Sequence, residues 1–531
     1  MGEIAEASAL GLSLKTTGLA DGKDGQSMPE PEAIPARKQM NTKNLGARRF
    51  LLAMSLMTFI PVLVVSAQEM PSPSSFRALF PQQLPNLFPF LDPTGAVETY
   101  TTDPSGRIDL TGPFFQTLGT NGRSCGTCHQ PSDAWSVSAA HVKARFELTA
   151  GTDPIFRTVD GSNCDHNIDV STERGREKAY SLLTRRGLIR ISLPVPQDAQ
   201  FEVVSVSNPY GCDDMANLSM YRRPLPAANL RFLSTVMFDG RESSPQTGTQ
   251  KITYVPAPHN LDSLLFDLAH QSVDATLGHA QAVPPGPTQE QQQDIVNFEM
   301  ALSVAQAFDF RAGYLNGDGA MGGPVPLSTQ PFFIGINDSF PPSFKFNPTG
   351  AQFTPTIFTL FDNWLTNNDD DDRRASIARG QQIFNSKLIN ISGVAGVNEV
   401  LGINVLPGAC STCHDSPNVG NHSFPAPLNI GTGDLTSPLD VSYLPVITLR
   451  NKTTGTVVQT TDPGRALITG LWADMGKVKG PILRGLAARA PYFHNGSART
   501  LMDVVNFYDL RFGVGFTGQE KADLVAFLSA L

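Results

Sequence analysis

Two short stretches of the chain hold residue types that could carry chemistry. In G-R-S-C-G-T-C-H-Q-P, residues 122 to 131, two cysteines stand three apart and a histidine follows at once. The same spacing recurs in A-C-S-T-C-H-D-S, within different surroundings. Four of the six cysteines therefore fall into two copies of one pattern, which comprises Cys125, Cys128 and His129, and Cys410, Cys413 and His414.

The pattern can be compared with three kinds of site. A zinc site needs four ligands, and one copy offers three with no paired second half nearby. A redox dithiol is expected at the start of a helix in a strand-helix unit, and no strand pattern precedes either copy. Covalent haem uses every residue, because the thiols attach to the vinyl groups and the histidine binds the iron. We therefore predict two covalently bound c-type haems.

The two remaining cysteines lie in loop-like sequence rich in Gly, Asn and Asp. Cys164 stands in D-G-S-N-C-D-H and Cys212 in P-Y-G-C-D-D. In an oxidising compartment such a pair favours a disulfide over two free thiols.

The first part of the chain has the features of a processing signal. A basic stretch, residues 41 to 49, precedes an apolar run from Phe50 to Val65, and Val65-Ser66-Ala67 before Gln68 has the small residues of a cleavage site. We predict a leader and signal peptide over residues 1 to 67, and a periplasmic or otherwise exported mature protein. A membrane anchor is the alternative, but the apolar run is short for a span.

Composition narrows the class of protein. The chain has 531 residues, 40% of them hydrophobic and 17% charged, with a net charge of −9. These values fit a globular protein of more than one domain. No basic face is available for nucleic acid, so we expect no nucleic-acid partner.

The elements that position the two motifs are expected to be helices. Capping boxes begin at Thr288 and Thr517, and the segment 374 to 384 is expected to form the helix that enters the second motif. Two sets of apolar residues recur on single helix faces: Ile295, Phe298, Leu302 and Ala305, and Leu524, Phe527, Leu528 and Leu531. Strand-like alternation is scarce.

We therefore predict a mainly α protein with two tandem cytochrome c-like haem domains and long loop insertions. The N-terminal domain spans residues 68 to 335 and includes a loop-rich insertion at residues 131 to 223. The C-terminal domain spans residues 336 to 531.

Three further stretches carry a family resemblance. V-M-F-D-G-R-E (236 to 242), D-I-V-N-F-E-M-A-L (294 to 302) and the segment 483 to 508, which contains A-P-Y-F-H-N-G, are similar to the bacterial di-haem cytochrome c peroxidase and MauG family. The resemblance implies an N-terminal peroxidatic haem bound by His129 and a C-terminal electron-transfer haem bound by His414.

The sixth ligand of the second haem is the most informative position. Family peroxidases have a methionine, and MauG-like proteins a tyrosine, fourteen residues after the histidine that is His494 here, and this chain has Tyr508. A phenolate lowers the reduction potential, whereas a thioether raises it. Met475, in A-D-M-G-K-V-K, is the alternative ligand.

The sequence departs from the family at three other positions. Phe238 replaces the tryptophan between the haems and loses its oxidisable indole. Arg223 falls near the family's calcium asparagine, which puts an inter-haem calcium ion in doubt. The family's acid-base glutamate falls near V-D-A-T-L-G-H, so His279 is our candidate for proton transfer, with Asp274 second.

The resemblance implies an exported peroxidase that reduces hydrogen peroxide at the N-terminal haem. Electrons would reach it through the C-terminal haem from a small cytochrome c or a cupredoxin, and a homodimer is a further partner to test. Two alternatives remain open: MauG-like or oxygenase-like oxidation of another substrate, and a di-haem cytochrome that only transfers electrons.

Overall fold

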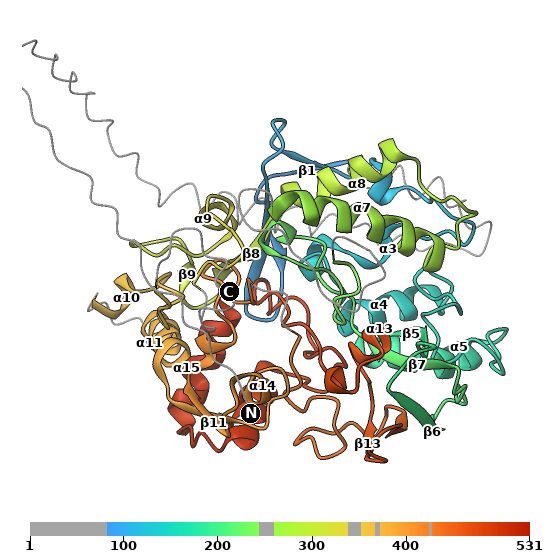
Figure 1. Cartoon of the computed structure of the whole chain (residues 1–531). Helices are drawn as coiled ribbons and strands as arrows, with labels where there is room; N and C mark the ends of the chain where they lie inside the picture. The colour runs from blue at the N-terminus through green and yellow to red at the C-terminus, as the bar shows by residue number, and fades with distance from the viewer. Residues whose placement is uncertain (1–81, 244–259, 338–351, 367–371, 424–426) are drawn as a thin grey trace, which may run out of the picture. The chain divides into compact units, whose positions relative to one another are not determined.

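The computed structural model describes residues 82 to 243, 260 to 337, 352 to 366, 372 to 423 and 427 to 531. All of them lie in one compact unit, Glu69–Leu531 (Figure 1). The predicted leader and signal peptide lies outside the described residues, and the domain boundary at residue 335 stays a prediction. Among the helices of the described ranges, none has the length and apolar character that a bilayer crossing requires.

A four-stranded sheet supports the first motif. Its order is β2 (Phe90–Leu91), β3 (Gly95–Thr101), β8 (Leu302–Asp309) and β9 (Gly313–Tyr314), with antiparallel pairing throughout. The helix predicted to run through Leu302 and Ala305 ends sooner, because α8 (Gln289–Ala301) passes directly into β8. Since β8 is buried on both faces, its sequence lacks alternation and resembles a buried helix segment.

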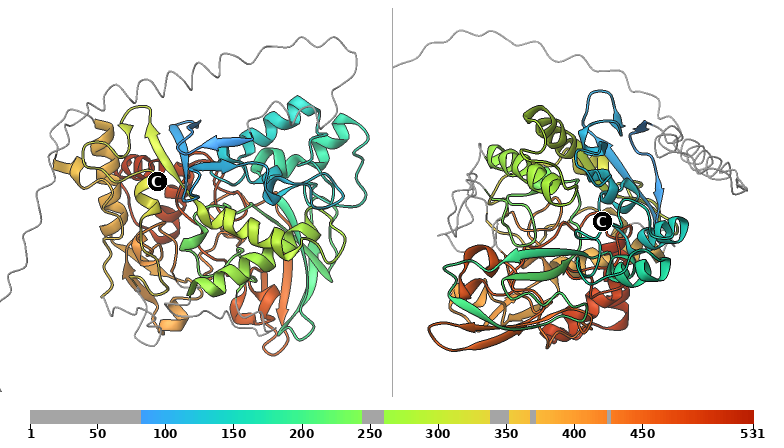
Figure 2. Two further views of the ribbon diagram at one scale, coloured as in Figure 1. Left: turned by 90° about the horizontal axis from the view of Figure 1, so that it is seen from above. Right: turned by 90° about the vertical axis from the view of Figure 1, so that its right-hand side faces the viewer.

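Two helices lie side by side over the first motif. They are α7 (Asn260–Gly278) and α8, and their adjacency is visible in Figures 1 and 2. The predicted capping box of Thr288 and Gln291 is present at the start of α8. Leu264 and Leu268 of α7 share one apolar cluster with Val296 of α8, so burial of these faces holds the pair together.

Residues 131 to 223, predicted to be rich in loops, contain more regular secondary structure than expected. They include three helices, α4 (Ala139–Thr149), α5 (Glu173–Ala179) and α6 (Ser181–Arg186), and three strands, β5 (Ile189–Pro194), β6 (Phe201–Ser207) and β7 (Asn217–Arg222). Most are too short to give a clear periodic pattern between Gly- and Asp-rich turns. A disulfide joins Cys164 to Cys212, as predicted.

One sheet joins distant parts of the chain. β6 pairs antiparallel with β12 (Val446–Asn451), which also pairs with β13 (Val457–Thr460). The inner side chains of this sheet form a cluster that includes Phe201, Ile447 and Leu449. The segment after the first motif is thereby fixed to the segment after the second.

Three helices surround the second motif. α11 (Asp372–Ser386) packs on α15 (Gly518–Ser529), and α15 packs on α14 (Leu501–Phe512). The predicted helix 374 to 384 and the capping box at Thr517 are confirmed. The predicted inward face is buried, and its members are Leu524, Phe527, Leu528 and Leu531.

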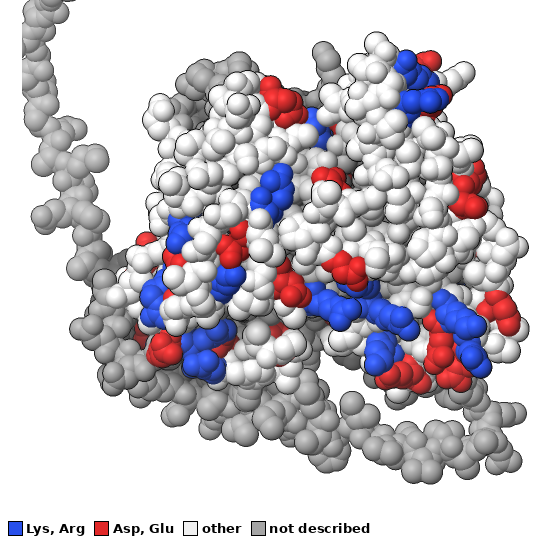
Figure 3. Space-filling view, turned by 90° about the horizontal axis from the view of Figure 1, so that it is seen from below, with Lys and Arg blue, Asp and Glu red and all other residues white. Residues whose placement is uncertain are grey.

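The prediction of a mainly α protein is met only in part. Helices surround the second motif, but the sheets built on β3 and β8, on β5 and β7, and on β6 and β12 account for much of the rest. Side chains of opposite charge lie next to one another on the face shown in Figure 3. A pair of opposite charge also joins two strands of one sheet, Arg450 on β12 and Glu202 on β6.

Candidate haem sites

The first motif presents a histidine with one ring nitrogen already occupied. Cys125–Cys128 forms the short helix α3, and His129 follows it. Nδ1 of His129 lies 2.9 Å from the carbonyl oxygen of Trp135. Because a carbonyl only accepts, Nδ1 carries the proton and Nε2 keeps its lone pair for a metal. The buried indole of Trp135 donates to Thr99 Oγ1 on β3 at 2.9 Å, which holds this carbonyl in place.

The second motif repeats this support. Cys410–Thr412 forms the 3₁₀ turn η5, and Nδ1 of His414 lies 2.9 Å from the carbonyl oxygen of Gly420. Burial is the main cause that lowers the pKa of His414 to about 4 and keeps its ring neutral. In both motifs the supporting carbonyl is six residues beyond the histidine. Both imidazoles are therefore prepared as neutral iron ligands.

The four motif cysteines are free thiols in the described structure. None of them forms a disulfide. Burial raises the pKa of Cys125, Cys410 and Cys413 to about 12, and it also raises the pKa of Cys128. All four thiols are therefore available for thioether bonds to haem.

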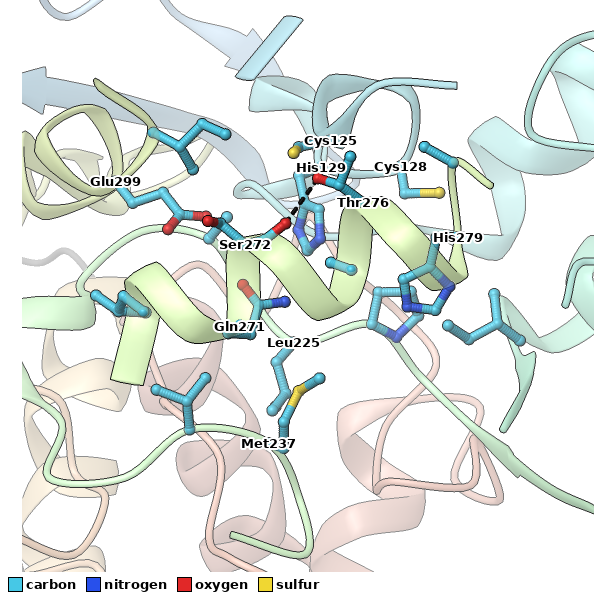
Figure 4. Close-up of a pocket in the computed structure, with 18 of the residues that line it drawn as sticks. Cys125, Cys128, His129, Leu225, Met237, Gln271, Ser272, Thr276, His279 and Glu299 are labelled. Atoms are coloured by element: carbon cyan, nitrogen blue, oxygen red, sulfur yellow. Dashed lines mark hydrogen bonds between the residues drawn. The ribbon is translucent and has the colours of Figure 1, made fainter. Parts of the chain in front are cut away.

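The first pocket lies between α3, α7 and α8 (Figure 4). α7 contributes one face, with Gln271, Ser272 and Thr276. α8 contributes Glu299, whose pKa burial raises to about 8, so that the carboxyl is mostly protonated at neutral pH. The remaining wall is largely apolar and includes Leu225, Met237, Leu268 and Ile295. Such a lining fits the apolar porphyrin.

The second pocket contains His414 and a buried cation. Its wall is mostly apolar, but Lys479 lines it and is only 6% exposed. Burial lowers the pKa of Lys479 to about 8, and its ammonium has no partner among the described residues. A haem carries two carboxylates on its edge, and the ammonium of Lys479 offers an ion-pair partner for one of them. Without such a partner, a buried positive charge would destabilise an apolar cavity. The donor set and charge of this pocket fit a haem.

His279 lies in the first pocket, directly after α7 (Figure 4). Its Nδ1 contacts Oδ2 of Asp160, and the other oxygen of Asp160 is ion-paired with Arg123. Burial alone would raise the pKa of Asp160, but His279 and Arg123 outweigh this and lower it. Asp160 is thus a carboxylate that fixes the proton of His279 on Nδ1. Nε2 has no hydrogen-bond partner in the part of the chain that the structure describes.

The backbone around His279 is also fixed. Its carbonyl oxygen accepts a hydrogen bond from Asn121 Nδ2 at 2.8 Å, and Arg123 Nε donates to Pro154 O at 2.9 Å. The other acid-base candidate, Asp274, instead belongs to a group with Glu242 and His270 and does not line the first pocket.

The structure separates the two candidate ligands of the second haem. Tyr508 on α14 lines the second pocket beside His414, whereas Met475 packs in the cluster of Ile447 and Leu449 and does not line that pocket. Burial raises the pKa of Tyr508, and its hydroxyl has no hydrogen-bond partner among the described residues. Of the two candidate ligands, Tyr508 alone lines the pocket that contains His414.

The two pockets share a wall. Arg223, Pro224, Leu225 and Phe238 line both of them. Phe238 is 7% exposed, and its ring centroid lies 6.0 Å from that of His494 in the second pocket. Its carbonyl oxygen accepts a hydrogen bond from Lys479 N at 2.6 Å. Phe238 therefore lies between the pockets and offers no polar atom of its side chain to either.

Several residues of the site are not evident from the motifs. The carbonyls of Trp135 and Gly420, and the carboxylate of Asp160, act at positions that depend on the fold. The fixed offset of six residues after each histidine is the one signal in the sequence that could have identified the carbonyls.

Comparison with known proteins supports the resemblance to cytochrome c peroxidases. No family model matches the chain. It is 36% identical over 135 residues to cytochrome-c peroxidase IdrP2 of Denitromonas iodatirespirans, covering 23% of this chain and 36% of that protein. It is 28% identical over 190 residues to cytochrome c peroxidase Ccp of Escherichia coli (strain K12), covering 34% of this chain and 31% of that protein. The aligned part spans less than half of each of these curated relatives.

Solved structures give weaker similarity. A MauG-like protein associated with microbial copper homeostasis aligns at 15% identity with a TM-score of 0.30, over 79% of this chain and 87% of that one. The hydrazine synthase of Kuenenia stuttgartiensis aligns at 15% identity with a TM-score of 0.28, over 75% of this chain and 93% of that one. The similarity to cytochrome c peroxidases therefore rests on the sequence matches.

Proposed function

We propose that the chain is an exported di-haem peroxidase that reduces hydrogen peroxide in the first pocket, with electrons entering through the second. One observation carries the proposal: His279, fixed by Asp160, lines the same cavity as His129. A haem held by His129 would supply the electrons for cleavage of the O–O bond. Reduction of one hydrogen peroxide to two waters takes two electrons and two protons, so the pocket must also move protons.

His279 is the residue suited to this proton movement. Nε2 can accept a proton from one peroxide oxygen and return it to the other, which then leaves as water. Asp160 keeps Nδ1 protonated throughout and stabilises the positive charge that His279 gains. The apolar lining from Leu225 and Met237 limits the water that competes for the same hydrogen bonds.

Replacement of His279 by alanine tests this role. We expect both haems to remain attached and cyanide still to bind, while peroxide turnover falls by about a hundredfold to ten-thousandfold. His141→Ala is the matched control, because His141 also pairs through Nδ1 with an aspartate, Asp133 at 2.6 Å, but lies outside both pockets. Near-normal turnover in His279→Ala would exclude His279 from catalysis.

Electron entry through the second pocket is the remaining part of the proposal. The pockets share Phe238 and residues 223 to 225, so an electron crosses one layer of side chains. A small cytochrome c or a cupredoxin is the donor we propose. The disulfide Cys164–Cys212 agrees with an exported protein, because such bonds persist in oxidising compartments.

Tyr508 favours a second candidate function, MauG-like oxidation of another substrate. A phenolate ligand lowers the reduction potential and stabilises ferric iron, which suits storage of oxidising power more than supply of electrons. The two functions differ in one assay. A peroxidase oxidises reduced cytochrome c stoichiometrically with added peroxide, whereas the alternative consumes peroxide with little oxidation of cytochrome c.

A further inference from the structure

The guanidinium of Arg223 is held between the two pockets by backbone carbonyls alone. Arg223 is 7% exposed. Nη1 donates to Arg186 O at 2.8 Å, and Nη2 donates to Arg489 O at 2.8 Å and to Val137 O. These carbonyls come from three separate segments: the chain after the first motif, the end of α6, and the segment 483 to 508.

This arrangement differs from that of the neighbouring arginine. Arg222 is ion-paired with the buried carboxylates of Asp239 and Asp462. Within the described ranges, no carboxylate forms an ion pair with Arg223. Burial, together with the nearby Arg489, lowers the pKa of Arg223 to about 9, yet the group is still mostly protonated at neutral pH. The fold therefore encloses a positive charge whose direct hydrogen-bond partners are backbone carbonyls.

Space for the guanidinium is provided by a glycine. A Cβ atom at Gly187 would overlap Nη1 of Arg223, and Gly187 has a φ of +60°, which other residues rarely adopt. Gly187 ends α6, so the same residue both terminates that helix and leaves room for the charge. The guanidinium thus occupies the space that a side chain at position 187 would need.

Converging backbone carbonyls are ligands typical of a calcium ion, which takes oxygen donors in flexible geometry. The resemblance places a calcium ion at this point of the chain, between the two haems, but the residues present do not fit one because a fixed cation already occupies the carbonyls. We propose that the guanidinium of Arg223 is a built-in cation that replaces bound calcium between the two haem pockets. The chain would then transfer electrons between the pockets without a metal ion there.

The test uses the full-length holoprotein with calcium chloride and EGTA as probes. In the wild type we expect no stoichiometric calcium by elemental analysis, and no change in haem spectra or in electron transfer between the haems with either probe. In Arg223→Asn, electron transfer between the haems should slow by about tenfold or more and recover when calcium is added, because the freed carbonyls can now bind the ion. Arg231→Asn is the control, since Arg231 also donates to a carbonyl, Gln330 O at 2.6 Å, but lines neither pocket.

Two results would overturn the proposal: a tightly bound calcium ion in the wild type whose removal by EGTA changes the spectra, or an Arg223→Asn protein that retains both haems and transfers electrons normally with and without calcium. If the variant fails to fold, calcium analysis of the wild type decides alone.

The proposal rests on the proposed haem sites and not on peroxide chemistry. A chain that lacks peroxide turnover would contradict the proposed function and leave the calcium and electron-transfer measurements valid.

Discussion

His129 and His414 have the same backbone support, but different side chains share their pockets. His129 shares its pocket with His279, a titratable side chain fixed by a carboxylate, and His414 shares its pocket with Tyr508. Under the proposed function, His279 in the first pocket moves protons and Tyr508 in the second binds iron. This contrast is the basis for assigning different roles to two sites with one motif.

The contrast predicts the ligand of the second haem. Tyr508→Phe removes the oxygen and should change the low-spin haem spectrum and raise the reduction potential of that haem. Met475→Leu should leave both unchanged, because Met475 packs in a separate cluster. Optical spectroscopy and redox titration of the two variants provide the measurement. The reverse pattern would assign the ligand to Met475 and make the second haem a high-potential donor.

At the scale of elements, an ion-pair network joins the end of β7 to the C-terminal half. Arg222, the last residue of β7, binds Asp462 with Nε and Nη2 at 2.7 and 2.9 Å, and its Nη1 binds Asp239. All three side chains are at most 4% exposed. Burial alone would raise the pKa of Asp462, but Arg222 outweighs it and holds the pKa below its ordinary value.

This network predicts a pH-dependent loss of stability. Asp462→Asn should lower the free energy of unfolding at pH 7 by about 3 kcal/mol, because it leaves a buried guanidinium partly unpaired. A depressed folded pKa contributes stability above the ordinary pKa of about 4, and this contribution is lost as the pH falls through the folded value. The difference between variant and wild type should therefore narrow below about pH 4, as thermal unfolding would measure.

Asp440→Asn is the control for that experiment. Asp440 lies 3.8 Å from Arg186 and is 61% exposed, so its loss should cost less than about 1 kcal/mol at any pH. If both substitutions lower the free energy of unfolding by the same amount, the buried network at Arg222 contributes no more to stability than the exposed pair.

The elements also show which parts of the fold the sequence could predict. Helices with capping boxes and one apolar face, such as α15, are local features and were predictable. β8 was not, because a strand buried on both faces has no alternation, and β6 was not, because its partner β12 is distant in the chain. The candidate site follows the same rule: the cysteines and histidines form contiguous motifs, whereas Asp160 meets His279 only through the fold.

At the scale of the whole molecule, the proposed export and the proposed haem attachment can be tested on the same sample. Purified from the periplasmic fraction of cells with haem-maturation machinery, the protein should begin at Gln68 and carry two haems that survive denaturation. Intact mass spectrometry measures both properties at once. A chain that retains residues 1 to 67, or haem that extracts into acidified solvent, would contradict the corresponding prediction.

If the chain is secreted as proposed, the pairing of β6 with β12 constrains the order in which its parts can fold. A chain that crosses a membrane from its N-terminus exposes β6 well before β12, and Arg222 well before Asp462. The sheet, the ion-pair network and the common wall of the pockets can form only when almost the entire polypeptide has been translocated. If the chain is exported as proposed, Cys125 and Cys128 emerge before β12 does. The first motif would then be accessible to a haem-attaching enzyme before this sheet can close.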